Sequence, residues 1–84
     1  MKIVEIESKL TRGKGVLYYN PKKRFFEAKI HGRIVNQWGM GHMIDLLRKI
    51  LGRTLSEVSP MVDKHGRVTN LNIIFADAKH IANQ

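Results

Sequence analysis

The sequence predicts a single α+β domain spanning residues 1–84, in which a mainly antiparallel sheet of four to five strands packs on one main helix. Three observations support this prediction. The chain is short and has an ordinary globular composition, with 43% hydrophobic and 26% charged residues. Runs of β-branched and aromatic residues are separated by turn signals through its first half. One later stretch carries apolar residues at helical spacing.

The N-terminus is predicted to begin with a strand and a basic loop. Residues 2–7 largely alternate, which places Val4 and Ile6 on one face of a short strand. Residues 8–15 follow with three cations and two glycines. Glycine lets a backbone approach a phosphate closely, but it equally makes a flexible connection. The Gly-Lys-Ser/Thr sequence of a nucleotide-hydrolysing loop does not follow.

Three further strands are predicted to form a meander. Turn signals at Asn20-Pro21 and His31-Gly32 set their boundaries. The first of these strands is apolar on both faces and is expected in the centre of the sheet, whereas the second alternates and has one wet face. We expect Phe26 and Trp38 in the core. The strands are predicted at residues 16–20, 25–30 and 33–38.

The stretch from residue 39 to 51 has the clearest helical pattern in the chain. Six apolar residues fall on one stripe, and Gly52 follows as a C-terminal stop. Asp45 and Lys49 are spaced for an i,i+4 ion pair on the wet side. Leu46 lies off the stripe, so its exposure would indicate a homodimer contact. The stripe consists of Met40, Met43, Ile44, Leu47, Ile50 and Leu51.

Shorter elements are expected after this helix. Residues 54–57 have the Thr-x-x-Glu spacing of a capping box, which predicts a short helix from Leu55 that ends or kinks at Pro60. The alternation over residues 68–75 predicts a last strand, and residues 77–84 are expected to form a short helix or a tail. One face of the last strand is predicted to carry Thr69, Leu71, Ile73 and Phe75.

The formal net charge of +8 is unevenly distributed. Residues 1–35 contain nine Lys or Arg and three Glu, for +6, and the remainder contains six Lys or Arg and four Asp or Glu, for +2. Such a concentration is typical of surfaces that bind phosphate backbones or anionic lipid. The chain contains no cysteine, signal peptide or apolar run of membrane-spanning length. These features predict a cytoplasmic protein without disulfides or membrane association.

The meander is the predicted nucleic-acid-binding element. Cations at its tips and along its strands would neutralise phosphates, and exposed aromatic rings would stack on bases. The alternative places the aromatic residues in the core and the cations at solvated strand ends. We expect a non-enzymatic protein with no catalytic residue, metal or cofactor, and with DNA favoured over RNA. The predicted binding residues are Lys9, Arg12, Lys14, Lys22, Lys23, Arg24, Lys29, Arg33, Tyr18, Tyr19 and Phe25.

Residues 15–51 resemble the AP2/integrase type of DNA-binding domain. The resemblance implies a three-stranded sheet that enters the major groove, with a helix bracing it from behind. It assigns contact roles to Lys22, Arg24, Lys29 and Arg33. The strands predicted near both ends of the chain are not required by that family. The likeness is carried by Gly15-Val16-Leu17-Tyr18-Tyr19, Lys23-Arg24-Phe25-Phe26-Glu27-Ala28-Lys29-Ile30, Gly32, and Trp38-Gly39 before a helix.

Two other functions fit parts of the sequence. A small phage- or plasmid-type regulator or inhibitor would bind an acidic protein through the same basic face, and the edge of the N-terminal strand would serve a partner or homodimerisation. The segment Asp63-Lys64-His65, with Asn70 and His80, resembles the hairpin and helix of His-Asn-His nucleases, which implies a metal-dependent nuclease. None of the four histidines has the spacing of a tight metal motif.

Overall fold

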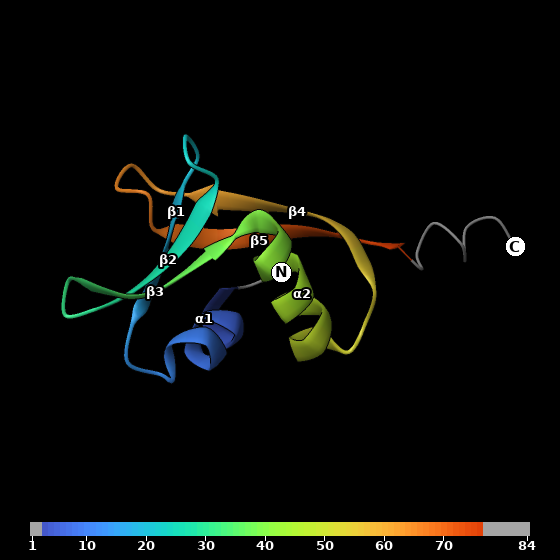
Figure 1. The fold of residues 1–84 in the computed structure, drawn as a ribbon, viewed down its shortest axis with the longest axis horizontal. Helices are drawn as coiled ribbons and strands as arrows, with labels where there is room; N and C mark the ends of the chain where they lie inside the picture. The colour runs from blue at the N-terminus through green and yellow to red at the C-terminus, as the bar shows by residue number, and fades with distance from the viewer. Residues whose placement is uncertain (1–2, 77–84) are drawn as a thin grey trace, which may run out of the picture.

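The computed structural model describes residues 3–76, which form two helices and five strands (Figure 1). The strands make a three-stranded antiparallel sheet in the order β1-β2-β3 and a separate two-stranded sheet, β4-β5. The predicted α+β class is confirmed, but the strands do not form one sheet. The elements are α1 (Ile3–Thr11), β1 (Val16–Asn20), β2 (Phe25–Ile30), β3 (Arg33–Gly39), α2 (Met40–Leu51), β4 (Leu55–Val62) and β5 (Val68–Phe75).

The N-terminal segment forms the helix α1, so the prediction of a strand over residues 2–7 is wrong. Ile3 and Ile6 are buried and Leu10 packs against the core, whereas Val4 is 70% exposed. Ile3, Ile6 and Leu10 lie at positions i, i+3 and i+7, which is the spacing of one helical face. A helix buries these three side chains together, and a strand would send Ile3 and Ile6 to opposite faces.

The meander β1-β2-β3 has the predicted strands, with β3 extended by one residue to Gly39. Leu17, Phe26 and Ala28 are fully buried on one face, here called the inner face. The strand β2 is central, so the expectation that residues 16–20 form the central strand is wrong. The strand β1 is apolar because α1 and both strands of the β4-β5 hairpin contact it. Trp38, expected in the core, packs half-buried against its margin.

The helix α2 confirms the helical prediction. Met43 and Leu47 are fully buried, and the rest of the stripe is half-buried. Gly52 ends the helix in the left-handed conformation (φ 66°), and its N–H donates to the carbonyl oxygen of Arg48. Asp45 pairs with Arg48 at 3.5 Å, one position before the predicted Lys49.

The β4-β5 hairpin replaces the short helix predicted from the capping-box spacing. Leu55 and Val58 are buried three residues apart, a helical spacing, because Ser56 is an extra residue in the strand register. Thr69 is the corresponding extra residue of β5, which places it on the exposed side and not on the predicted apolar face. The hydroxyl groups of Ser56 and Thr69 donate to carbonyl oxygens of the opposite strand. Pro60 is tolerated because β4 is an edge strand.

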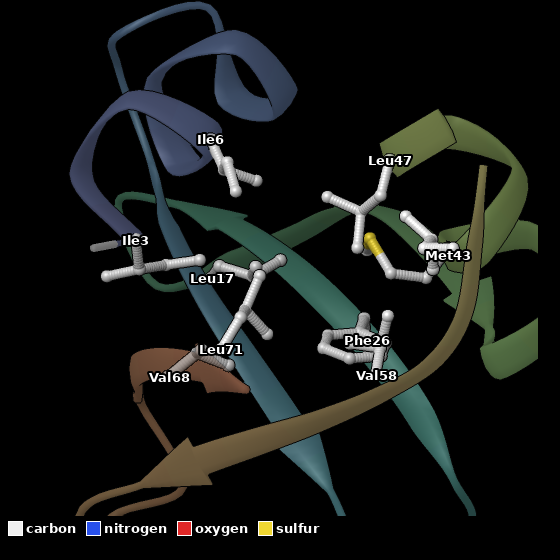
Figure 2. Packing of buried hydrophobic residues seen from close by; sticks show 10 residues of the cluster. Ile3, Ile6, Leu17, Phe26, Met43, Leu47, Val58, Val68 and Leu71 are labelled. Carbon is white, nitrogen blue, oxygen red and sulfur yellow. The ribbon is translucent and has the colours of Figure 1, made fainter. Parts of the chain in front are cut away.

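One hydrophobic core joins all these layers (Figure 2). Side chains from α1, α2, the inner face of the meander and the hairpin converge in it, as the labelled residues show. No helix within residues 3–76 is long and apolar enough to cross a lipid bilayer. The predictions for residues 77–84, including His80, lie outside the described residues. The buried cluster comprises Ile3, Ile6, Leu17, Phe26, Met43, Leu47, Leu55, Val58, Val68 and Leu71.

The outer edge of β1 is closed by two unrelated groups. The N–H of Leu17 donates to Oε2 of Glu7 in α1 at 3.0 Å. The N–H of Tyr19 donates to the carbonyl oxygen of Gly66 in the β4-β5 turn at 2.9 Å. The bond from Tyr19 belongs to the single antiparallel bridge between Tyr18 and Arg67, through which the hairpin meets β1. The bond to Glu7 occupies the next outward-pointing donor of β1. Because Glu7 takes the place of a hairpin acceptor at Leu17, the pairing between β1 and the hairpin ends at this bridge.

Replacing Glu7 with alanine is expected to destabilise the protein by about 1–3 kcal/mol, because the buried N–H of Leu17 loses its acceptor. The measurement is the free energy of unfolding from urea denaturation. Glu5→Ala is the matched control, since Glu5 is exposed on the same helix, and it should stay within about 0.5 kcal/mol. Equal effects of the two substitutions would contradict this account of the β1 edge.

Candidate nucleic-acid interface

The predicted cations occupy both ends of the meander. The first group lies partly before β1 and partly at the β2-β3 turn, and the second forms the β1-β2 turn. The two groups are separated by the length of β1, roughly 15 Å. Lys29 lies on β2 opposite Val16, near the first group, and its Nζ lies over the ring of Tyr18. Seven of the eight predicted cations are exposed, and the eighth, Lys29, is half-buried. The first group is Lys9, Arg12, Lys14 and Arg33, and the second is Lys22, Lys23 and Arg24.

The β1-β2 turn has a defined shape that separates its cations. Oδ1 of Asn20 accepts the N–H groups of Lys22 at 3.0 Å and Lys23 at 3.3 Å, and the carbonyl oxygen of Asn20 accepts the N–H of Arg24. Lys22 lines a hollow on the face of the meander opposite the core, here called the open face. Arg24 lines a different hollow, together with Met40 of α2 and part of β4. The tip therefore presents cations to two surfaces.

A row of polar side chains crosses the open face. Tyr18, Glu27 and Gln37 lie opposite one another in the register of β1, β2 and β3. Nε2 of Gln37 donates to Oε2 of Glu27 at 3.3 Å. Lys29 lies diagonally across from Tyr18, with Nζ 4.4 Å from the ring centroid in a cation–π contact. Lys29 is therefore held over an aromatic ring and not over the neighbouring carboxylate.

The β4-β5 turn brings a further basic group to this face. Oδ1 of Asp63 accepts the N–H groups of His65 at 2.8 Å and Arg67 at 3.0 Å. The hydrogen bond from the His65 backbone is the main cause that lowers the pKa of Asp63 below its usual value. Because Gly66 bonds to Tyr19, the turn lies beside β1, as the adjacent tips in Figure 1 show. His65 thereby reaches the hollow that Lys22 lines.

This surface is named the Tyr18 hollow. It has a volume of about 300 Å³ and combines the half-buried Tyr18 with basic groups from three separate segments. Sequence reasoning missed His65 and Glu27 as members of the site. Nothing in the local pattern near residue 65 identifies its neighbour, because only the hairpin pairing and the bond from Tyr19 to Gly66 place it there. The hollow is lined by Tyr18, Tyr19, Asn20, Pro21, Lys22, Glu27, Lys29, His65 and Gly66.

The three predicted aromatic contacts have different environments. Phe25 is 44% exposed at the start of β2, and Tyr18 is half-buried on the open face. The ring of Tyr19 packs against buried Phe26, with centroids 4.7 Å apart. Tyr18 and Phe25 are thus accessible to a ligand, whereas the Tyr19 ring is engaged in packing. Leu46, the proposed dimer contact, is half-buried beside Trp38.

The basic loop before β1 is shaped by packing at Gly15. A Cβ atom at this position would lie 2.7 Å from the carbonyl oxygen of Lys29 and 2.9 Å from the side chain of Ile30. The neighbouring Thr11 is buried, and its hydroxyl donates to the carbonyl oxygen of Glu7 at 2.7 Å. Position 15 therefore requires glycine because the loop approaches β2 closely. This packing explains the glycine without any contact between the loop and a phosphate.

The residues of the proposed nuclease motif do not assemble a metal site in the described chain. Within residues 3–76, no group of three or more His, Asp or Glu side chains is placed to hold a metal ion. Oδ1 of Asp63 is engaged by two backbone N–H groups of its own turn. Asn70 lies half-buried on β5, and its Oδ1 has no hydrogen-bond partner among these residues.

Comparison with known proteins finds no match: no family model, no curated protein and no solved structure corresponds to this chain. The resemblance to AP2/integrase domains therefore stays a prediction. The structure contains the implied order of three antiparallel strands followed by a helix, and it adds α1 and the β4-β5 hairpin.

Gly15→Ala is expected to destabilise the protein by about 1–3 kcal/mol, because the added methyl group overlaps the backbone of β2. Gly41→Ala is the control, since nothing lies within 4 Å of a Cβ at that position, and it should be neutral or slightly stabilising in helix α2. Thermal unfolding of both variants tests this. An unchanged melting temperature for Gly15→Ala would show that the loop accommodates the added methyl group, and it would contradict the close contact with β2.

The β4-β5 turn is expected to loosen at low pH. Because the pKa of Asp63 is lowered in the folded state, its ionised carboxylate stabilises the turn above the unfolded value of about 3.9, and this contribution is lost as the pH falls through the folded pKa. NMR titration of the His65 and Arg67 amide protons should show a transition centred below that value. Asp63→Asn should remove the transition, and its persistence would assign it to another group.

Proposed function

We propose that this protein is a non-enzymatic nucleic-acid-binding protein, with DNA favoured over RNA, that contacts the phosphate backbone through the basic meander. The observation that carries the proposal is the Tyr18 hollow, where Lys22, Lys29 and His65 gather around an aromatic ring from three separate segments. The net charge of +8 favours the approach of a polyanion over the whole surface.

The mechanism is phosphate neutralisation with counterion release. Exposed cations at both ends of the meander contact successive phosphates, and those on the open face continue the path between them. The flexible side chain of lysine suits contacts to a nucleic-acid backbone whose geometry varies, because its ammonium group is a point charge that needs no fixed orientation. Binding of this kind positions a strand but does not by itself select a sequence.

A second candidate function is docking of a protein partner at β3. This strand is an edge of the sheet, and Ile34 and Val35 are 49% and 55% exposed on it. Exposed strand edges accept an added strand from a partner. The register shift at Ala28/Lys29 leaves Val35 as an extra residue, and such a bulge opposes regular pairing. The first candidate is therefore the better supported.

The test is fluorescence anisotropy with labelled duplex DNA, single-stranded DNA and RNA over a range of salt concentrations. Engagement of four to six phosphates predicts a log–log salt slope of about −4 to −5 on duplex. The double variant Lys22→Gln/Lys23→Gln should reduce the magnitude of the slope by about 2, at about 0.9 for each phosphate contact. A slope near zero on all three nucleic acids for the unmodified protein would overturn the proposal and favour a protein partner.

The control variant is Lys49→Glu, which changes the net charge by the same two units. Lys49 is exposed on α2, where it lines a separate hollow with Trp38 and His42. It should leave the salt slope nearly unchanged if binding is confined to the meander. Equal losses in the two variants would show that net charge alone, and not this surface, determines binding.

A further inference from the structure

The Tyr18 hollow contains a group that backbone binding does not require. Lys22, Lys29 and His65 suit phosphate, but the carboxylate of Glu27 lines the same hollow and repels it. The polar partner of Glu27 in the described chain is Gln37, and Lys29 lies over the Tyr18 ring. A carboxylate kept in the middle of a basic surface is suited to accept hydrogen bonds from a ligand.

We propose that the Tyr18 hollow binds one unpaired nucleotide of a single strand and prefers guanine. The base stacks on Tyr18, its phosphates contact Lys22 and Lys29, and its donor edge bonds to Glu27. This inference rests on the proposed nucleic-acid binding and adds the form of the strand and a base preference. The volume of about 300 Å³ lies at the lower end of the range for small-molecule sites.

Stacking on Tyr18 requires that Lys29 leave the ring. An exposed cation–π contact is weaker than base stacking on an aromatic side chain, so the exchange is favourable. The released ammonium group remains close enough to meet the phosphate of the same nucleotide, because the lysine stem is flexible. Lys29 thus covers the ring in the free protein and binds the backbone in the complex.

Glu27 determines the base preference. It lies directly opposite Tyr18 in the register, where Cβ atoms of paired residues are about 4.5–5.5 Å apart. An ionised carboxylate only accepts hydrogen bonds. Guanine presents two adjacent donors, N1–H and the N2 amino group, whereas cytosine and adenine present one amino group and thymine one imino group between two carbonyls. Gln37, which already donates to Glu27, can donate to guanine O6.

Two constraints favour a single strand over a duplex. The donor edge of guanine is occupied in a base pair, so Glu27 can bind it only in an unpaired base. The meander with the β4-β5 turn beside β1 spans three interstrand spacings, about 14 Å, and the major groove is about 12 Å wide. The turn therefore obstructs insertion of this face into a duplex.

The experiment measures anisotropy for ten-nucleotide DNA strands of thymine that carry a single central G, C, A or T. The G strand should bind about fivefold or more tightly than the all-thymine strand, as expected for a bidentate contact, and more tightly than its duplex. Glu27→Gln removes a negative charge with almost no change in shape. It should bind the all-thymine strand more tightly and lose the preference for G.

Glu57→Gln is the matched control, because Glu57 is exposed on β4 and its substitution changes the charge equally. It should keep the preference for G. Tyr18→Leu should weaken binding of all four strands by about fivefold or more, through lost stacking. Equal affinity for the four strands, an undiminished preference in Glu27→Gln, or tighter binding to the duplex would overturn the inference while salt-dependent binding stands. Absence of salt-dependent binding to any nucleic acid would overturn the proposed function as well.

Discussion

The closure of the β1 edge is the constraint on which the arrangement of this protein depends. Two N–H groups of β1 point away from its sheet, and they are bound by Glu7 of α1 and by the carbonyl oxygen of Gly66. An unpaired N–H next to a buried residue is costly, so these bonds tie α1 and the β4-β5 turn to the same strand. The bond from Leu17 to Glu7 also stops the hairpin from pairing with β1 beyond the bridge at Tyr18 and Arg67. Arg67 adds a longer contact to the second oxygen of Glu7, at 3.7 Å.

The open face takes its chemistry from this closure. The bond between Tyr19 and Gly66 holds the hairpin tip beside β1, where His65 lines the same hollow as Lys22 and Lys29. The turn is itself stiffened by the carboxylate of Asp63, which binds two of its N–H groups. Residues used for folding therefore position residues suited to a ligand. Within residues 3–76, both helices pack into the core on the inner face of the sheet (Figure 2).

Two segments show how a short local pattern can mislead in opposite directions. At residues 2–7, a short alternation predicted a strand, but the spacing of Ile3, Ile6 and Leu10 forms one face of helix α1. At residues 54–57, the capping-box pattern predicted a helix, but the chain forms β4, in which the extra residue Ser56 lets a strand bury both Leu55 and Val58. A bulge converts a three-residue spacing into the same face of a sheet, and the hydroxyl of Ser56 stabilises it by bonding to the partner strand.

By itself, the sequence determined the α+β class, the three strands of the meander, helix α2 with its stop at Gly52, and the concentration of cations in the first half of the chain. These features follow from local periodicity, turn residues and composition, which act over a few neighbours. Only the tertiary structure decided the separation into two sheets, the central position of β2, the packing role of Tyr19 and the meeting of His65 with Lys22 and Glu27. Each of these depends on which distant segment satisfies a backbone N–H or fills a core position. These pairings depend on residues that are far apart in the chain, so no local sequence pattern predicts them.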